Sequence, residues 1–75
     1  MIKDKYYIIS KIEIFIQSYK HEYQSIGNEI KIYLEESEIS IVVDKYINIY
    51  THDNDEPFSY QTLDKALLKL KTIIS

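Results

Sequence analysis

Residues 28–52 read NEIKIYLEESEISIVVDKYINIYTH, and this stretch decides the fold. Apolar residues, most of them β-branched, alternate with polar ones in three runs. A period of two is typical of half-buried strands, whose successive side chains point to opposite faces. The pattern predicts a three-stranded antiparallel meander with one apolar face and one polar face. The expected inward-facing residues are Ile30, Ile32, Leu34, Ile39, Ile41, Val43, Ile47 and Ile49.

The lengths of the two connections set the expected register. A two-residue turn at 36–37 lets every inward residue face another inward residue, as a single buried face requires. Because neither turn position is Gly or Asn, such a turn has to be strained or longer. A three-residue loop at 44–46 satisfies the same requirement for the second hairpin. The predicted pairs are Leu34 with Ile39, Ile32 with Ile41, Ile30 with Val43, Val43 with Ile47, and Ile41 with Ile49.

One long helix is predicted before this sheet, over residues 4–26. Its apolar residues recur at spacings of three and four and form a single stripe. Asp4 suits the N-cap, and Gly27 suits the position just past the C-terminus. Residues 12–16 also alternate as a strand would, but the helical pattern is the longer match. The stripe consists of Ile8, Ile9, Ile12, Phe15, Ile16, Tyr19, Tyr23 and Ile26.

A loop and a second helix follow the sheet. Asp, Asn and Pro mark residues 51–57 as a loop, and residues 58–60 form either a short edge strand or a plug. Thr62 is the expected N-cap of a helix over Leu63–Ile74. The order is α-β-β-β-α. We therefore expect a single α+β domain over residues 1–75, with both helices packed on one face of the three-stranded meander.

Composition narrows the function. The chain has no cysteine, which excludes disulfides and thiolate metal sites and suits a reducing cytoplasm. The start of the sequence does not resemble a signal peptide, and no apolar run approaches the ~20 residues of a membrane span. All nine basic residues are lysine, so bidentate guanidinium recognition of phosphate or guanine is excluded. We expect a cytoplasmic protein that is not an enzyme, has no catalytic residues, and needs no cofactor or metal.

Charge is unevenly distributed along the chain. The net charge is −3 overall, but +1 over residues 1–28, −7 over residues 29–64 and +3 over residues 65–75. In a meander, the first turn and the exit from the third strand lie at the same end of the sheet. Two acidic segments should therefore converge there, with no lysine inside either segment. Their carboxylates are Glu35, Glu36, Glu38, Asp53, Asp55 and Glu56.

This acidic surface has two interpretations. It either keeps a small domain soluble or docks a basic protein partner. An EF-hand calcium loop starting at Asp53 fails, because Pro57 and Phe58 occupy positions that need a ligand and a glycine. His52 is expected beside Glu38, an arrangement that a general base would need, but no nucleophile is placed near it. His21 is expected to be exposed on the polar side of the first helix.

Two tyrosines extend the candidate surface. Tyr33 and Tyr50 are expected on the outer sheet face, flanking Ser40. Tyrosines on an open sheet face stack on RNA bases in some proteins, but Lys31 is the only basic residue beside them. Direct nucleic-acid binding is therefore disfavoured. A protein interface, where tyrosine is enriched, is the better interpretation.

Tyr7 and Ile14 stand apart from the core stripe of the first helix. They form either an exposed apolar spot or a contact with another molecule. A homodimer formed through these two residues is the rival hypothesis, in which the protein is a self-associating structural or regulatory protein.

The acidic segments Glu35-Glu36-Ser37-Glu38 and Asp53-Asn54-Asp55-Glu56 lie at strand ends of a small, cysteine-free α-β-β-β-α chain. In this the chain resembles some phage-encoded anti-CRISPR inhibitors, in architecture and charge and without a shared motif. The resemblance implies an inhibitor that occupies the nucleic-acid-binding surface of a nuclease. The function we expect is therefore that of an acidic, non-enzymatic protein-binding domain.

Overall fold

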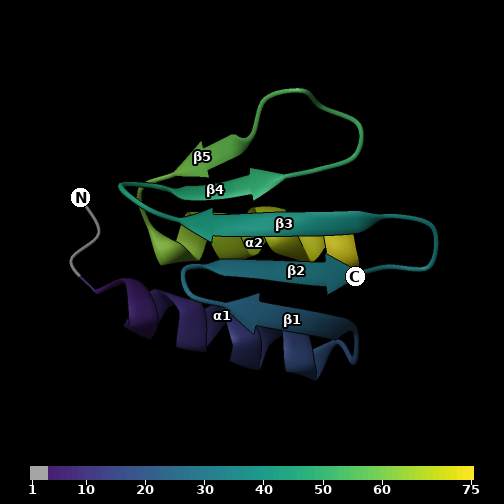
Figure 1. Cartoon of the computed structure of the whole chain (residues 1–75), viewed down its shortest axis with the longest axis horizontal. Coiled ribbons are helices and arrows are strands. Elements are labelled where there is room, and N and C mark those ends of the chain that lie inside the picture. The colour runs from purple at the N-terminus through teal and green to yellow at the C-terminus, as the bar shows by residue number, and fades with distance from the viewer. Residues whose placement is uncertain (1–3) are drawn as a thin grey trace.

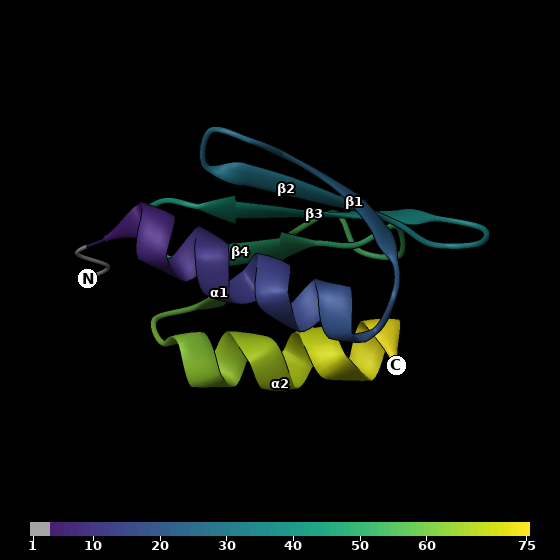
Figure 2. The ribbon, with the colours of Figure 1, turned by 90° about the horizontal axis from the view of Figure 1, so that it is seen from below.

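The computed structural model describes residues 4–75. Its elements are α1 (Lys5–Ser18), β1 (Glu22–Ile26), β2 (Glu29–Tyr33), β3 (Glu38–Val43), β4 (Ile47–Tyr50), β5 (Phe58–Tyr60) and α2 (Leu63–Ile74). The strands form one antiparallel sheet in the order β1-β2-β3-β4-β5, and both helices cover the same face of it (Figures 1 and 2). The predicted α+β class and the two-layer packing are confirmed. The predicted strand count is wrong, because the sheet formed by residues 4–75 has five strands and not three.

The first helix is shorter than predicted. Asp4 caps it as expected, since its carboxylate accepts a hydrogen bond from the Tyr7 N–H (3.0 Å). The helix ends at Ser18, and Lys20 turns the chain away with a φ of 62°. Tyr23 and Ile26, which were expected on the helical stripe, lie in strand β1 instead. Their spacings continue the helical pattern of the preceding residues, so the periodicity did not reveal the turn at Lys20, and in β1 the two residues point to opposite faces.

A tight hairpin joins β1 to β2. Gly27 was expected to end a helix, but its φ of +59° serves the turn between the two strands. Residues with positive φ are the ones that two-residue hairpin turns require. The neighbouring Asn28 ties this turn to β3, because its side chain donates to the Val43 carbonyl and its carbonyl accepts from the Val43 N–H, both at 2.9 Å.

The β2–β3 register differs from the prediction by two residues. Ile30 pairs with Ile41 and Ile32 pairs with Ile39, so the connection spans residues 34–37. It is closed by the Leu34 N–H, which donates to the Ser37 carbonyl (2.8 Å). The longer loop avoids the positive φ values that a two-residue turn would force on Glu36 and Ser37. An even shift keeps every side chain on its predicted face.

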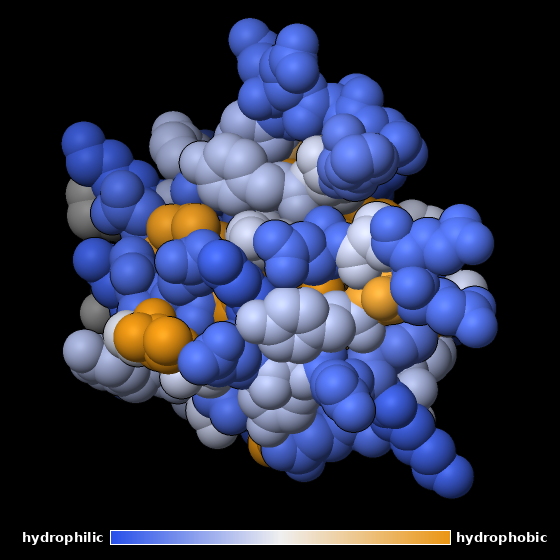
Figure 3. Space-filling view, turned by 45° about the vertical axis from the view of Figure 1, so that its right-hand side comes forward, coloured by the Kyte–Doolittle hydropathy of each residue, from blue (hydrophilic) through white to orange (hydrophobic). Residues whose placement is uncertain are grey.

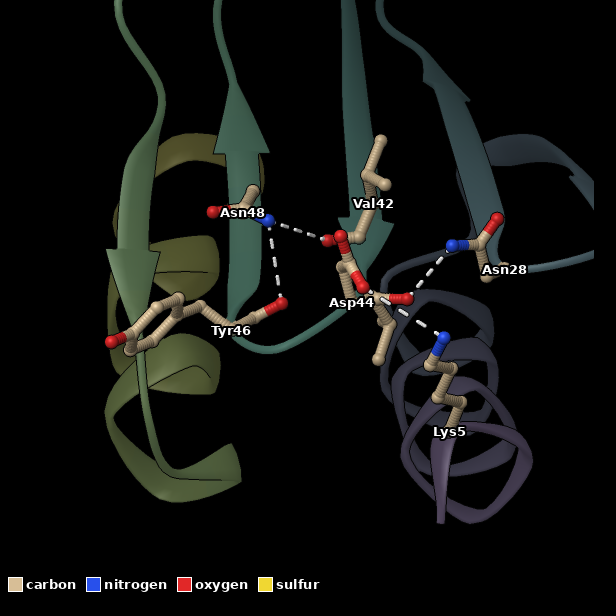
Figure 4. A network of polar contacts seen from close by, with 7 residues as sticks. Lys5, Asn28, Val42, Asp44, Tyr46 and Asn48 are labelled. Carbon is tan, nitrogen blue, oxygen red and sulfur yellow. Dashed lines mark hydrogen bonds and ion pairs between the residues drawn. The ribbon is translucent and has the colours of Figure 1, made fainter. Parts of the chain in front are cut away.

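The β3–β4 register is as predicted, with Val43 opposite Ile47 and Ile41 opposite Ile49. Polar contacts fix this loop at the end of the sheet that also holds the β1–β2 turn (Figure 4). The Asp44 N–H donates to the Tyr46 carbonyl (2.9 Å), and the Asp44 carboxylate lies 3.8 Å from the Lys5 ammonium group.

The core lies between the sheet and the helices and consists almost entirely of isoleucine. Strands β2, β3 and β4 supply the inner face, and each helix supplies three buried residues. Of the two alternatives for residues 58–60, the structure shows the edge strand. As predicted, Thr62 caps α2 by accepting from the Lys65 N–H (3.4 Å). The buried residues are Ile9, Ile12, Ile16, Ile30, Ile32, Ile39, Ile41, Val43, Ile47, Ile49, Ala66, Leu70 and Ile74.

His21 links the connection between α1 and β1 to the C-terminal end of α2. Its Nε2 atom lies 2.6 Å from the carbonyl oxygen of Ile74, at the end of α2. The prediction of an exposed His21 on a helix is therefore wrong, because the residue is half-buried and lies between α1 and β1. It satisfies one of the carbonyls that a helix C-terminus leaves without a partner.

Candidate protein-docking site

The two acidic segments lie at the same end of the sheet. The β2–β3 connection carries Glu35 and Glu36, and β3 starts with Glu38; the β4–β5 connection carries the other three acids. Antiparallel neighbours bring these two connections to one end, on the right in Figure 1. We call the six carboxylates the acidic end: Glu35, Glu36, Glu38, Asp53, Asp55 and Glu56, all of them exposed.

A hollow of about 370 Å³ lies between the two connections. Apolar side chains from the sheet and α2 line part of it, and polar groups of the β4–β5 connection line the rest. Within that connection, the Asn54 side-chain amide donates to the Thr51 hydroxyl (3.4 Å). The lining residues are Leu34, Ser37, Ile39, Thr51, His52, Asp53, Asn54, Phe58, Lys69 and Ile73.

Lys69 adds a positive charge to the acidic end that the sequence analysis did not expect. The sequence placed no lysine within the acidic segments, but α2 delivers Lys69 into the hollow between them. Its ammonium group lies 4.0 Å from the centroid of the Phe58 ring, a cation–π contact. The lining of the hollow thus contains one cation, Lys69, and one carboxylate, Asp53. Only the packing of α2 against β5 could reveal this, since residues 53 and 69 are far apart in the sequence.

His52 lies in the β4–β5 connection, because β4 ends at Tyr50. It is exposed and lines the hollow. The expected contact with Glu38 does not form: within residues 4–75, no histidine nitrogen lies within 4.0 Å of a carboxylate oxygen. In the same part of the chain, no three His, Asp or Glu side chains are grouped closely enough to hold a metal ion. The acidic end is therefore a dispersed surface of charge.

Tyr33 and Tyr50 lie on the open sheet face, as expected, and are 39% and 42% exposed. Tyr33 lies opposite Glu38 on β3, and its hydroxyl donates to the Gln24 side chain (3.1 Å). The prediction that both tyrosines flank Ser40 is wrong for Tyr33, because the register is shifted. The shift brings Tyr33 to the acidic end. Seen from this side, the surface is mostly hydrophilic, with separate small apolar spots (Figure 3).

Tyr7 and Ile14 are exposed on α1, with 54% and 57% of their surfaces accessible. The Lys11 ammonium group lies 5.4 Å from the centroid of the Tyr7 ring and shields part of it. Sequence reasoning missed a larger apolar exposure, that of Ile26 on β1, because it placed this residue on a buried helix face.

Comparisons with protein-family models, curated proteins and solved structures found no match to this chain. No helix within residues 4–75 is long and apolar enough to cross a membrane.

Proposed function

We propose that this protein is a non-enzymatic binding domain whose acidic end docks a basic surface of a protein partner. The observation that supports the proposal is the placement of two exposed acidic connections on either side of one hollow. Carboxylates arranged in this way steer a basic partner during encounter and disfavour acidic ones. Tyr33, at the same end, and Tyr50 add aromatic contact area on the adjoining sheet face.

The finer proposal concerns the kind of partner. A basic surface that attracts dispersed carboxylates is also one that attracts nucleic-acid phosphates. We therefore infer a nucleic-acid-handling partner, such as a CRISPR nuclease, whose activity the domain inhibits by covering that surface. A duplex DNA competitor should then displace the domain from its partner, and raised salt should weaken both interactions.

The test uses the double variant Glu36→Lys/Asp55→Lys, which reverses one charge in each acidic connection. We expect binding to fall, mainly through a slower association rate, because steering acts on encounter. Wild-type protein and the variant would be used to capture partners from the native host. The association rate of each captured partner would then be measured at low and high salt.

A matched control carries the same change in net charge at the opposite end of the sheet. Asp44 and Asp64 lie in the β3–β4 connection and the first turn of α2. The variant Asp44→Lys/Asp64→Lys should keep most of the wild-type binding. Equal binding by wild type and Glu36→Lys/Asp55→Lys at low salt would show that the acidic end serves solubility alone.

A second candidate function is self-association, and the exposure of Tyr7 and Ile14 favours it. If these residues form a homodimer contact, Ile14→Lys should give a folded monomer, because Ile14 lies outside the core. Sedimentation of wild type and variant at micromolar concentrations measures their oligomeric state, and circular dichroism shows whether both are folded. A wild type that sediments as a monomer at the highest concentration would exclude this contact.

A further inference from the structure

The two edge strands of the sheet, β1 and β5, differ in how accessible they are to pairing with another strand. β5, at one edge, has three residues, follows Pro57, and keeps Phe58 and Tyr60 half-buried. β1, at the other edge, has five residues, four of which are exposed. Short length, proline and covering side chains are features that blunt a sheet edge against pairing. The five residues of β1 show none of these features, and α1 lies in the layer behind this strand (Figures 1 and 2).

The ladder shows which backbone groups of β1 point outward. The Leu34 N–H bonds to Ser37 across the β2–β3 connection, so the even-numbered residues of β2 bond toward β3. Backbone groups alternate in direction along an antiparallel strand, so the odd-numbered residues of β2 bond toward β1. Their partners in β1 are Glu22, Gln24 and Ile26. The N–H and C=O groups of Tyr23 and Ser25 therefore point away from the sheet.

The outer face beside this edge offers an apolar contact. Ile26 is 68% exposed and borders a shallow hollow of about 170 Å³. Glu29 and Lys31 line the same hollow and place one charge of each sign in it. An apolar side chain from an added strand would cover Ile26 there without meeting a net charge.

The inner face beside the edge offers a carboxylate. Glu13 of α1 reaches β1, where it accepts hydrogen bonds from the Tyr23 hydroxyl (3.3 Å) and the Ser25 hydroxyl (3.4 Å). Among residues 4–75, no lysine lies within ion-pair distance of Glu13. A basic side chain on the inner side of an added strand would meet this negative charge.

We propose that the open edge of β1 binds an extended segment of a partner protein in which apolar and basic residues alternate. The segment adds a strand to the sheet, and its backbone pairs with Tyr23 and Ser25. Its apolar residues lie on the outer face against Ile26, and its basic residues lie on the inner face against Glu13. A second copy of this chain matches the edge less well, because it brings a second set of the same carboxylates.

The test uses a short, end-capped peptide in which valine and lysine alternate, added to the isotope-labelled full chain. We expect the amide signals of Tyr23 and Ser25 to shift and their hydrogen exchange to slow. A peptide in which glutamate replaces lysine should leave both amides unchanged. This inference does not depend on the acidic end, so Glu36→Lys/Asp55→Lys should leave the response of the two amides intact.

Two variants sharpen the test. Ser25→Pro removes one outward N–H without touching the ladder to β2, and it should abolish the response. Glu13→Gln keeps the contacts to both hydroxyls but loses the charge, so the affinity should fall about two- to fivefold. The proposal is overturned if the glutamate peptide binds equally well, or if only amides of the acidic end shift. It is also overturned if Tyr23 and Ser25 become protected without peptide as the protein concentration rises, because a second copy then occupies the edge.

Discussion

At the scale of single residues, Ile41 tests the inner face of the sheet. It is fully buried in the central strand and lies between Ile30 and Ile49 in the ladder. Ile41→Ala removes buried methyl groups and leaves a cavity, which costs ~2–5 kcal/mol. Domains of this length rarely have more than ~3–5 kcal/mol of stability, so this loss approaches the whole stability and should lower the unfolding midpoint in urea steeply.

The neighbouring Val42 supplies the control for this measurement. It lies in the same strand but points to the opposite, open face, where it is only half-buried. Val42→Ala should therefore lower the unfolding midpoint in urea much less than Ile41→Ala does. Equal losses for the two variants would mean that the assigned faces of β3 are incorrect.

At the scale of elements, the sequence predicted some parts well and others poorly, for physical reasons. β2, β3, β4 and α2 were found because each buries one face and so carries a clear hydrophobic period. β1 was missed because it is an edge strand with a single half-buried residue, Tyr23, and has no such period. The signal that could have found it is the dipeptide Gly27-Asn28, a known hairpin turn sequence.

In the candidate site, features that follow from strand order could be predicted, and features that depend on contacts between distant segments could not. The convergence of the two acidic connections follows from meander topology and could be predicted. The β2–β3 register depends on the length of the connection between these two strands. Glu36 and Ser37 carry no turn signal such as Gly or Asn, so the sequence did not specify that length. Lys69 in the hollow and His21 at the end of α2 depend on contacts between distant segments. No periodicity or local motif encodes contacts of that kind.

At the scale of the whole molecule, charge is separated between the layers of the fold. The net charge of −7 over residues 29–64 lies on strands β2–β5 and their connections, extending only to the first turn of α2, whereas residues 65–75 of α2 carry +3. Like charges on neighbouring connections repel, so the acidic end is tolerated by the fold and does not stabilise it. The melting temperature of the wild type should rise with moderate salt, because screening weakens this repulsion.

Two charge-reversal variants should therefore change stability in opposite directions at low salt. Glu36→Lys/Asp55→Lys relieves repulsion, so its melting temperature should equal or exceed that of the wild type and depend less on salt. Asp44→Lys/Asp64→Lys loses the contact with Lys5 and a negative charge at the start of α2, so its melting temperature should fall slightly. Thermal denaturation of all three proteins across a salt series makes the comparison. A clear loss of stability in Glu36→Lys/Asp55→Lys would mean that these carboxylates support the fold, and a loss of partner binding in that variant could then no longer be assigned to docking.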